Sequence, residues 1–266
     1  MKIYDFSFGD NNKKLSDFGF IVCKFGDGGL DTISNGSVVS FDSVPVQNGA
    51  KHELISSTYE DCLECVIQVC RNPCTGGNIE IDHTTFRELT RWLCRKRFMK
   101  FKPISDDYID LYYEALISVS RIEIDGKLYG LELEIRTNRP FALKEAKTIN
   151  IINKTIDGKH SINDISHEEG HIYPHTEIIV NDDGNLNIYN AIENRSTYIA
   201  NCVAGEVITM DYPVIQSSIS SHNIQNDFNW NFFRIANTYD NSRNDLTISL
   251  PCSIKIKYSP IVKVGL

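Results

Sequence analysis

Residues 112–136 read YYEALISVSRIEIDGKLYGLELEIR, two strand-like segments around a single turn. In the second segment Leu131, Leu133 and Ile135 alternate with polar residues, which is the period of two of a strand with one buried face. Asp125-Gly126 separates the segments and is typical of a hairpin turn, because both residues tolerate a positive φ. This stretch predicts a long β-hairpin at the centre of a mainly β fold.

One amphipathic helix is predicted just before this hairpin, over residues 84–96. Thr85 with Glu88 three residues later fits a capping box, and Asp82 places negative charge where the helix dipole favours it. The helix carries an apolar stripe and ends in cations, which are favourable in a last turn. The stripe is formed by Phe86, Leu89 and Leu93 beside Trp92, and the cations are Arg95, Lys96 and Arg97.

The rest of the first half consists of short strand-like segments separated by turn residues. Strands are expected over residues 2–8, 19–25, 38–46, 52–57, 62–71 and 98–104. Asn138-Arg139-Pro140 and the charged residues 144–147 mark a domain boundary. The prediction for residues 1–143 is a β-sandwich with one flanking helix and the long hairpin.

The second half, residues 144–266, contains about eight expected strands and no predicted helix. They cover residues 149–154, 176–180, 186–190, 197–203, 207–210, 232–235, 245–250 and 253–258. Asp182-Asp183-Gly184 is predicted to be a hairpin turn between two of them. Short strands at roughly 10-residue spacing are typical of a sandwich or a barrel.

Composition excludes several classes of protein. The chain has 266 residues, 41% hydrophobic and 23% charged, with a net charge of −8. That acidity argues against a dedicated nucleic-acid-binding protein, whose surface is usually basic. We find no apolar run near the roughly 20 residues that span a bilayer and no signal peptide. We therefore expect folding in a reducing cytoplasm, with the eight cysteines as thiols.

His167-Glu168-Glu169-Gly170-His171 spells the H-E-x-x-H pattern of zinc proteases. That chemistry requires both imidazoles on one face of a helix, with a Glu as base. Gly170 within the motif and Pro174 just after it disfavour a helix. We interpret the segment as a polar turn, and a zinc hydrolase at His167 and His171 is a third hypothesis that elemental analysis would test.

Four cysteines, Cys62, Cys65, Cys70 and Cys74, are close enough in sequence for a metal site to be considered. Structural zinc usually takes a Cys-x2-Cys pair on a turn, so that the two thiolates converge. Cys62 and Cys65 have opposite parity on a predicted strand and point to opposite faces. Only Cys70 and Cys74 are expected to approach each other, and we favour ordinary core or surface thiols.

Residues 91–102 interleave basic and aromatic side chains, a pattern that also occurs in nucleic-acid-binding proteins. The alternative is that Trp92, Phe98 and Phe101 belong to the core while the cations are solvated at a helix end. Because the flanking sequence is acidic, we favour the second interpretation.

Trp230 lies among Phe228, Phe232 and Phe233, with asparagines at 226, 229 and 231. The group resembles a sugar-stacking surface, but alternation places Phe228, Trp230 and Phe232 on one side, as in a buried strand. We favour the core interpretation. No phosphate-binding loop, nucleophile elbow or paired carboxylates accompany it, so we predict no enzyme, no cofactor, and no catalytic, cofactor-binding or metal-ligating residue.

Several short motifs together resemble the distal tail protein (Dit) family of long-tailed, non-contractile phages and prophages. In chain order they are Ser16-Asp17-Phe18-Gly19-Phe20, Tyr59-Glu60-Asp61-Cys62-Leu63-Glu64-Cys65, Arg91-Trp92-Leu93, Asp106-Asp107, Tyr112-Tyr113-Glu114-Ala115 and Asn138-Arg139-Pro140-Phe141. Residues 50–143 carry most of the specificity. Residues 170–174 resemble the family's entry into a galectin-like β-sandwich.

The resemblance implies a structural protein of the phage tail tip or baseplate, assembled in the host bacterial cytoplasm. Members form a homohexameric ring, with N-terminal domains making the ring and C-terminal domains projecting outward. The ring joins the tail tube protein to the tail-associated, receptor-binding proteins and surrounds a DNA channel, without a membrane or specific nucleic-acid binding. The alternative is a carbohydrate-binding module in which residues 144–266 bind a host cell-wall saccharide.

Overall fold

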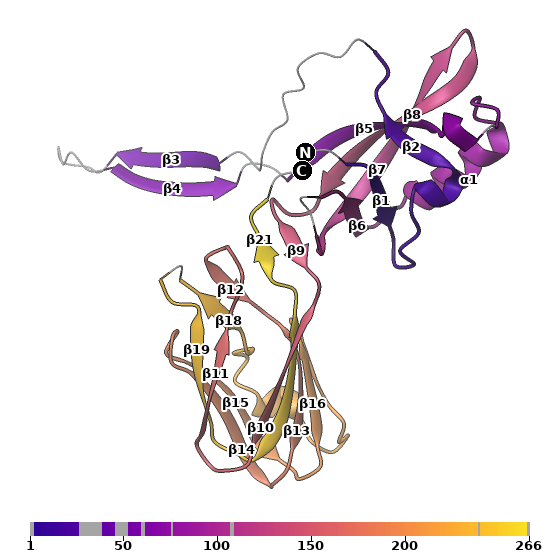
Figure 1. Cartoon of the computed structure of the whole chain (residues 1–266). Helices are drawn as coiled ribbons and strands as arrows, with labels where there is room; N and C mark the ends of the chain where they lie inside the picture. Colours follow the sequence, from indigo (N-terminus) through magenta and orange to yellow (C-terminus); the bar gives the residue numbers. More distant parts are fainter. Residues whose placement is uncertain are drawn as a thin grey trace. The chain divides into compact units, whose positions relative to one another are not determined.

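The computed structural model describes residues 3–26, 39–45, 53–59, 62–75, 77–106, 109–238 and 240–264. The chain divides into two compact units, Met1–Lys144 with Lys263–Leu266, and Glu145–Val262 (Figure 1). Both are built from antiparallel strands, which confirms the mainly β, two-domain prediction. The predicted limits, residues 1–143 and 144–266, differ from these units at residue 144 and at the last four residues.

Some predicted features lie outside the described part of the chain. These are Glu60, Asp61 and Asp107, together with one or both ends of the strands expected over residues 2–8, 38–46 and 52–57.

The N-terminal unit contains one principal antiparallel sheet in the order β1-β6-β7-β8-β5-β2, with β9 beside β7. A separate ladder joins β3 and β4. We predicted a β-sandwich with one flanking helix. Within the described residues the strands form this one principal sheet and the β3-β4 ladder, and α1 packs against β7. The strands are β1 (Asp5–Phe8), β2 (Phe20–Cys23), β3 (Val39–Pro45), β4 (Glu53–Tyr59), β5 (Glu64–Arg71), β6 (Met99–Ile104), β7 (Leu111–Ile124), β8 (Lys127–Thr137) and β9 (Ala142–Lys144), and two 3₁₀ turns are η1 (Ser16–Phe18) and η2 (Pro73–Thr75).

The long hairpin forms as predicted, from β7 and β8. Asp125 and Gly126 both have positive φ, 49° and 73°, as a tight turn between twisted strands requires. Leu131, Leu133 and Ile135 are completely buried. Their spacing places them on one face, so the period of two identified the core of this sheet.

The helix α1 spans His83–Leu93 and is shorter than expected. The predicted capping box of Thr85 and Glu88 is wrong: the N-cap is Asp82, whose Oδ1 accepts from the Thr85 backbone N–H at 2.9 Å. Asp82 Oδ2 also accepts from the Thr85 hydroxyl. Aspartate is among the best N-cap residues because its carboxylate satisfies a free helical N–H and favours the positive end of the dipole.

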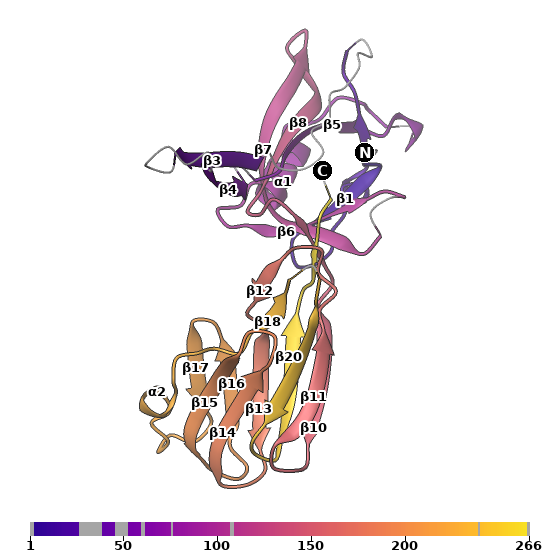
Figure 2. The same ribbon diagram turned by 90° about the vertical axis from the view of Figure 1, so that its left-hand side faces the viewer.

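The C-terminal unit is a two-layer β-sandwich (Figure 2). One sheet has the order β10-β20-β13-β16-β17 and the other β11-β19-β14-β15. Ile178 and Ile256 from the first sheet share a core with Leu186 and Ile248 from the second. The strands are β10 (Lys147–Asn153), β11 (Gly158–Asn163), β12 (Gly170–Ile172), β13 (His175–Val180), β14 (Gly184–Asn190), β15 (Arg195–Cys202), β16 (Val207–Asp211), β17 (Val214–Ser217), β18 (Ile235–Asn237), β19 (Arg243–Ile248), β20 (Cys252–Tyr258) and β21 (Ile261–Val262).

Four expectations for this half are corrected. Strands β11, β12, β17 and β21 were not predicted, because each is short and lacks an extended apolar alternation. The strand expected over residues 232–235 begins only at Ile235, and a one-turn helix, α2 (Ile224–Asp227), precedes it. Asp182-Asp183-Gly184 is no hairpin turn, because β13 and β14 belong to different sheets and the turn crosses between them. None of the described helices is long and apolar enough to cross a membrane.

Candidate functional site

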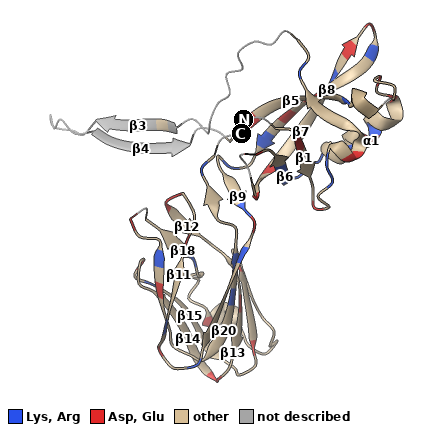
Figure 3. Ribbon diagram, viewed as in Figure 1, with Lys and Arg blue, Asp and Glu red and all other residues tan. Residues whose placement is uncertain are grey.

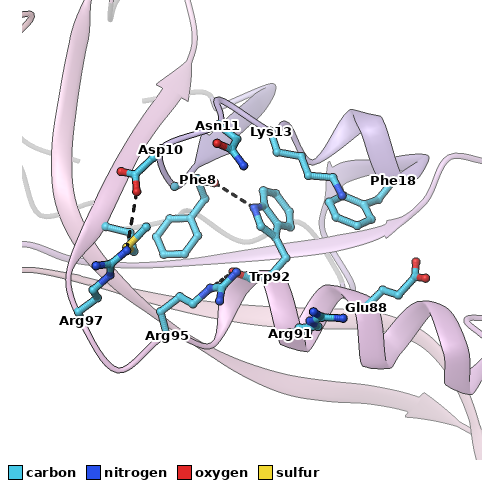
Figure 4. Close-up of a pocket in the computed structure, with 12 residues that line it drawn as sticks. Phe8, Asp10, Asn11, Lys13, Phe18, Glu88, Arg91, Trp92, Arg95 and Arg97 are labelled. Carbon is cyan, nitrogen blue, oxygen red and sulfur yellow. Dashed lines mark hydrogen bonds and ion pairs between the residues drawn. The ribbon is translucent and has the colours of Figure 1, made fainter.

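A hollow of about 530 Å³ lies at the C-terminal end of α1 in the N-terminal unit (Figure 4). We refer to it as the α1 groove. Three segments form it: the turn after β1, the last turns of α1, and the start of β6. It is lined by Phe8, Gly9, Asp10, Asn11, Lys13, Phe18, Glu88, Arg91, Trp92, Arg95, Arg97 and Met99.

Trp92 and the half-buried Phe18 form the aromatic floor of the α1 groove, and Trp92, of which 8% is exposed, is held in one position. Its indole Nε1–H donates to the Phe8 carbonyl at 2.9 Å, which ties α1 to the end of β1. The indole also stacks on Phe18, with ring centroids 4.7 Å apart, and on Phe6 at 5.8 Å. A buried Trp with a satisfied N–H is a rigid aromatic surface.

The rim of the α1 groove is predominantly cationic, with four basic side chains against two acidic ones. Arg97 pairs loosely with Asp10 at 3.8 Å, and the Lys13 ammonium lies 3.8 Å from the centroid of the Phe18 ring. Arg95 Nε donates to the Trp92 carbonyl at 3.1 Å, which satisfies a carbonyl at the helix end. The groove therefore combines an aromatic floor with guanidinium groups, a chemistry suited to carboxylates or phosphates.

The predicted division of residues 91–102 into core aromatics and solvated cations is largely confirmed. Trp92 and Phe101 are buried, and Arg91, Arg95, Lys96 and Arg97 are exposed. Phe98 is the exception, because 44% of it is exposed, so its assignment to the core is wrong. Phe98 lies in the connection between α1 and β6, where the helical period no longer applies.

The H-E-x-x-H motif does not form a helix. Residues 167–169 form a bend, and β12 begins at Gly170, whose φ of +124° few residues other than glycine adopt. The His167 backbone N–H donates to Ile261, and the His171 ring packs edge-on against Tyr173. Burial lowers the pKa of His171, with the nearby Arg234 acting in the same direction. The polar-turn interpretation is confirmed for the first part of the motif.

The cysteines of the first half do not pair as their spacing suggested. Cys70 on β5 lies beside Cys23 of the adjacent strand β2. Burial raises the pKa of the Cys65 thiol to about 12, and burial together with Cys70 does the same for Cys23. Thiols that stay protonated at neutral pH are poor nucleophiles and poor metal ligands. The partnership of Cys23 and Cys70 is non-local, so sequence spacing did not predict it.

The core interpretation of residues 228–233 is partly wrong. Phe228, Phe232 and Phe233 are buried as expected, but 57% of Trp230 is exposed. Trp230 has a φ of +58°, which breaks the alternation of a strand. Asn229 holds this turn: its Oδ1 accepts from the backbone N–H groups of Tyr198 and Asn231, and its Nδ2 donates to Ser196.

A buried hydrogen-bonded cluster around Glu206, just before that turn in the sequence, was not predicted. Glu206 accepts hydrogen bonds from the Ser217 hydroxyl, the Val203 backbone N–H and His222 Nδ1, the last at 2.6 Å. His222 Nε2 lies 3.3 Å from Asp227 in α2. Burial raises the pKa of Glu206, but these hydrogen bonds outweigh burial and hold the pKa below its ordinary value. The members are far apart in sequence, so no local signal identifies the cluster.

Comparison with known proteins agrees with the fold. Residues 1–139 match the phage tail protein N-terminal domain family, and residues 141–258 match the phage tail C-terminal domain family. The chain is also similar to the Dit (gp 19.1) protein of phage SPP1, whose crystal structure is described as a paradigm of the hub adsorption apparatus in phages infecting Gram-positive bacteria. That similarity has a TM-score of 0.59 at 11% identity and covers 97% of this chain and 99% of the SPP1 protein. No curated protein sequence matches the chain.

The resemblance predicted from short motifs is thus confirmed both by the domain matches and by the fold. The N-terminal match alone spans more than half of the sequence. Together with its two β-rich units, this places the chain in the phage tail protein family, as a tail component with a Dit-like fold.

Proposed function

We propose that the chain forms a homohexameric hub ring at the tip of the phage tail. In this proposal the N-terminal domains make the ring, the C-terminal domains project outward, and DNA passes through the central channel. The ring connects the tail tube to the tail-associated, receptor-side proteins. Its role is mechanical, and it makes or breaks no covalent bond.

The observation that carries this proposal is the similarity in fold to the SPP1 hub protein over 97% of the chain, combined with the two phage tail domain matches. Physical features of the chain are compatible with it. A ring needs a heterologous interface whose rotation closes after a fixed number of copies. A net charge of −8 disfavours adhesion of the chain to DNA passing through it. Basic and acidic residues are both spread over the described part of the ribbon (Figure 3).

Light scattering coupled to size-exclusion chromatography, with negative-stain microscopy, tests the proposal on the purified full chain. The chain is examined alone and mixed with the tube protein of the same phage. We expect six-fold rings in at least the mixture. Rings of another symmetry, or a monomer in both samples, would contradict the proposal.

A second function, saccharide binding by the C-terminal half, is favoured by one observation. Trp230 is largely exposed although its backbone adopts a φ that bulky residues rarely accept. Strain of this kind is often retained at binding sites. A glycan array with the full chain and with Trp230→Ala tests it. Saturable binding that the substitution abolishes supports the function, and identical signals from both proteins refute it.

A further inference from the structure

Two arginines of the α1 groove have guanidinium groups left for a ligand. Within the described ranges, Arg91 has no hydrogen-bond or ion-pair partner, and Arg95 uses only its Nε. Arg91 also borders a second hollow, of about 440 Å³, formed with Arg87 one helical turn earlier and with Phe86 and Thr90. A line of guanidinium groups therefore follows the exposed face of α1, beside the aromatic floor made by Trp92.

The α1 groove selects for a particular ligand chemistry. An aromatic floor favours an apolar side chain, and guanidinium groups at the rim favour carboxylates, which they bind through two parallel hydrogen bonds. Asp10 and Glu88 also line the groove and repel anions, so they disfavour a continuous run of phosphates more than a segment that carries only two carboxylates. The complementary ligand is therefore a protein segment in which an apolar residue is flanked by acidic residues.

This chain presents such a segment at the tip of its long hairpin. Glu123, Ile124 and Asp125 are consecutive, and 55% of Ile124 is exposed, although it is a large apolar residue. The two cations near the tip are already engaged, one of them with the tip's own Glu123. Arg121 lies over the Phe86 ring and 3.8 Å from Glu123, and Lys127 pairs with Glu80 at 3.3 Å.

The tip and the α1 groove lie at opposite ends of α1 within the N-terminal unit. Val119 of β7 lies next to Cys94, at the C-terminal end of α1, whereas Arg121 lies over Phe86 in the first turn. The hairpin then continues beyond the N-terminus of α1, where the Ile81 N–H donates to Leu128. The α1 groove is formed at the last turn of α1. This helix has 11 residues and is about 16 Å long, because each residue adds 1.5 Å. The tip therefore does not reach the groove of its own copy.

We infer that the hairpin tip of one copy docks into the α1 groove of the next copy. Ile124 lies on the aromatic floor, and Asp125 pairs with one of the two guanidinium groups of Arg91 and Arg95 in the neighbouring chain. Glu123 exchanges its loose 3.8 Å pair with Arg121 for the other guanidinium group. The contact joins two different patches, so it is heterologous and generates a ring or an open filament. Its closure into a ring rests on the proposed function, but the docking chemistry does not.

A peptide tests the docking directly, without requiring a ring. The probe is a fluorescent, backbone-cyclised hairpin of residues 119–129, titrated against the full chain and followed by fluorescence polarisation. We expect binding that weakens about tenfold in Arg91→Glu, because a close charge pair becomes repulsive. Phe18→Ala removes part of the aromatic floor and is expected to weaken peptide binding as well. Lys154→Glu makes an equal charge change in the C-terminal unit and is expected to leave peptide binding unchanged.

Charge reversal in the full chain provides the second test. Arg91→Glu and Glu123→Arg are each expected to reduce self-association in sedimentation velocity, and the two together to restore it. Rescue of this kind does not arise from a merely structural role of either residue.

The failure of this inference is distinguishable from the failure of the hub proposal. A peptide that does not bind overturns the docking, whether or not rings form. Rings that persist in both single variants also overturn it and leave the hub proposal intact. Binding of short duplex DNA that Arg91→Glu abolishes, without peptide binding, assigns the groove to nucleic acid instead.

Discussion

The two tryptophans of this chain have similar neighbours in the sequence but differ in burial. Trp92 is 8% exposed and its indole N–H is satisfied, whereas Trp230 is 57% exposed. Both occur among phenylalanines, and both were predicted to be buried. The difference is backbone conformation: Trp92 lies in a regular helix, and Trp230 lies in a turn with positive φ. Periodicity predicts burial only where the backbone remains regular.

The largest expected effect is at Trp92. Trp92→Ala removes a buried aromatic ring and leaves the Phe8 carbonyl without its donor, so we expect a loss of about 3–5 kcal/mol in unfolding free energy. Hydrogen exchange of α1 and β6, measured by mass spectrometry, reports on this unit. Trp92→Phe is the matched control and should lose less, because it keeps one six-membered aromatic ring and loses the hydrogen bond and the remainder of the indole. Equal losses in both variants would mean that burial of the ring contributes little.

The cluster that precedes Trp230 should have the next largest effect. Glu206→Gln replaces a buried carboxylate that receives three hydrogen bonds, at an expected cost of about 1–3 kcal/mol. Urea unfolding followed by circular dichroism measures it. Ser249→Ala is the comparison, because it removes a single hydroxyl at a partly exposed position and should cost less.

The same cluster predicts a pH dependence with a definite sign. The folded pKa of Glu206 lies below its ordinary value, because hydrogen bonds from Ser217, His222 and Val203 outweigh burial. Its contribution to stability is therefore complete above the unfolded pKa of about 4.3 and is lost as the pH falls through the lower folded value. Unfolding free energies measured between neutral and acidic pH should fall more steeply in the wild type than in Glu206→Gln. Parallel curves would contradict this assignment.

Asn229 holds the turn that exposes Trp230, so its substitution tests whether that turn sets the difference between the two tryptophans. Asn229→Ala removes three side-chain hydrogen bonds that hold the backbone around Trp230. Because the site is exposed, we expect a loss of only about 1 kcal/mol. Faster hydrogen exchange confined to residues 196–231 would support the role of Asn229 in positioning the backbone around Trp230. Unchanged exchange there would mean that the turn is held by other contacts.

Trp230 itself should have the smallest effect. Trp230→Ala is expected to change stability by less than about 0.5 kcal/mol, as for exposed residues in general. Trp230→Gly is expected to be neutral or stabilising, because glycine adopts positive φ without strain. Thermal unfolding compares the two. A loss as large as that of Trp92→Ala would show that the exposed indole is structurally important.

Much of the N-terminal sheet could be predicted because its signals are local. The alternation from Leu131 to Ile135 and the Asp125-Gly126 turn located the hairpin without tertiary information. The helix was predicted correctly, but its N-cap was not. Asp82 and Thr85 are both residues that start helices, and only the backbone conformation, extended at Asp82 and helical at Thr85, decides between them. The α1 groove was not predicted as a site, because β1, α1 and β6 meet there only after folding.

The sequence by itself determined the class of the molecule: strand-rich halves, a single substantial helix, an acidic chain, and the resemblance to distal tail proteins. Tertiary structure alone decided which neighbours each residue acquires. It placed Cys70 beside Cys23, assembled Glu206 with His222, and exposed Trp230. The physical reason is that hydrophobic periodicity and turn propensity act over a few residues, whereas burial, ion pairing and strain depend on contacts between distant segments.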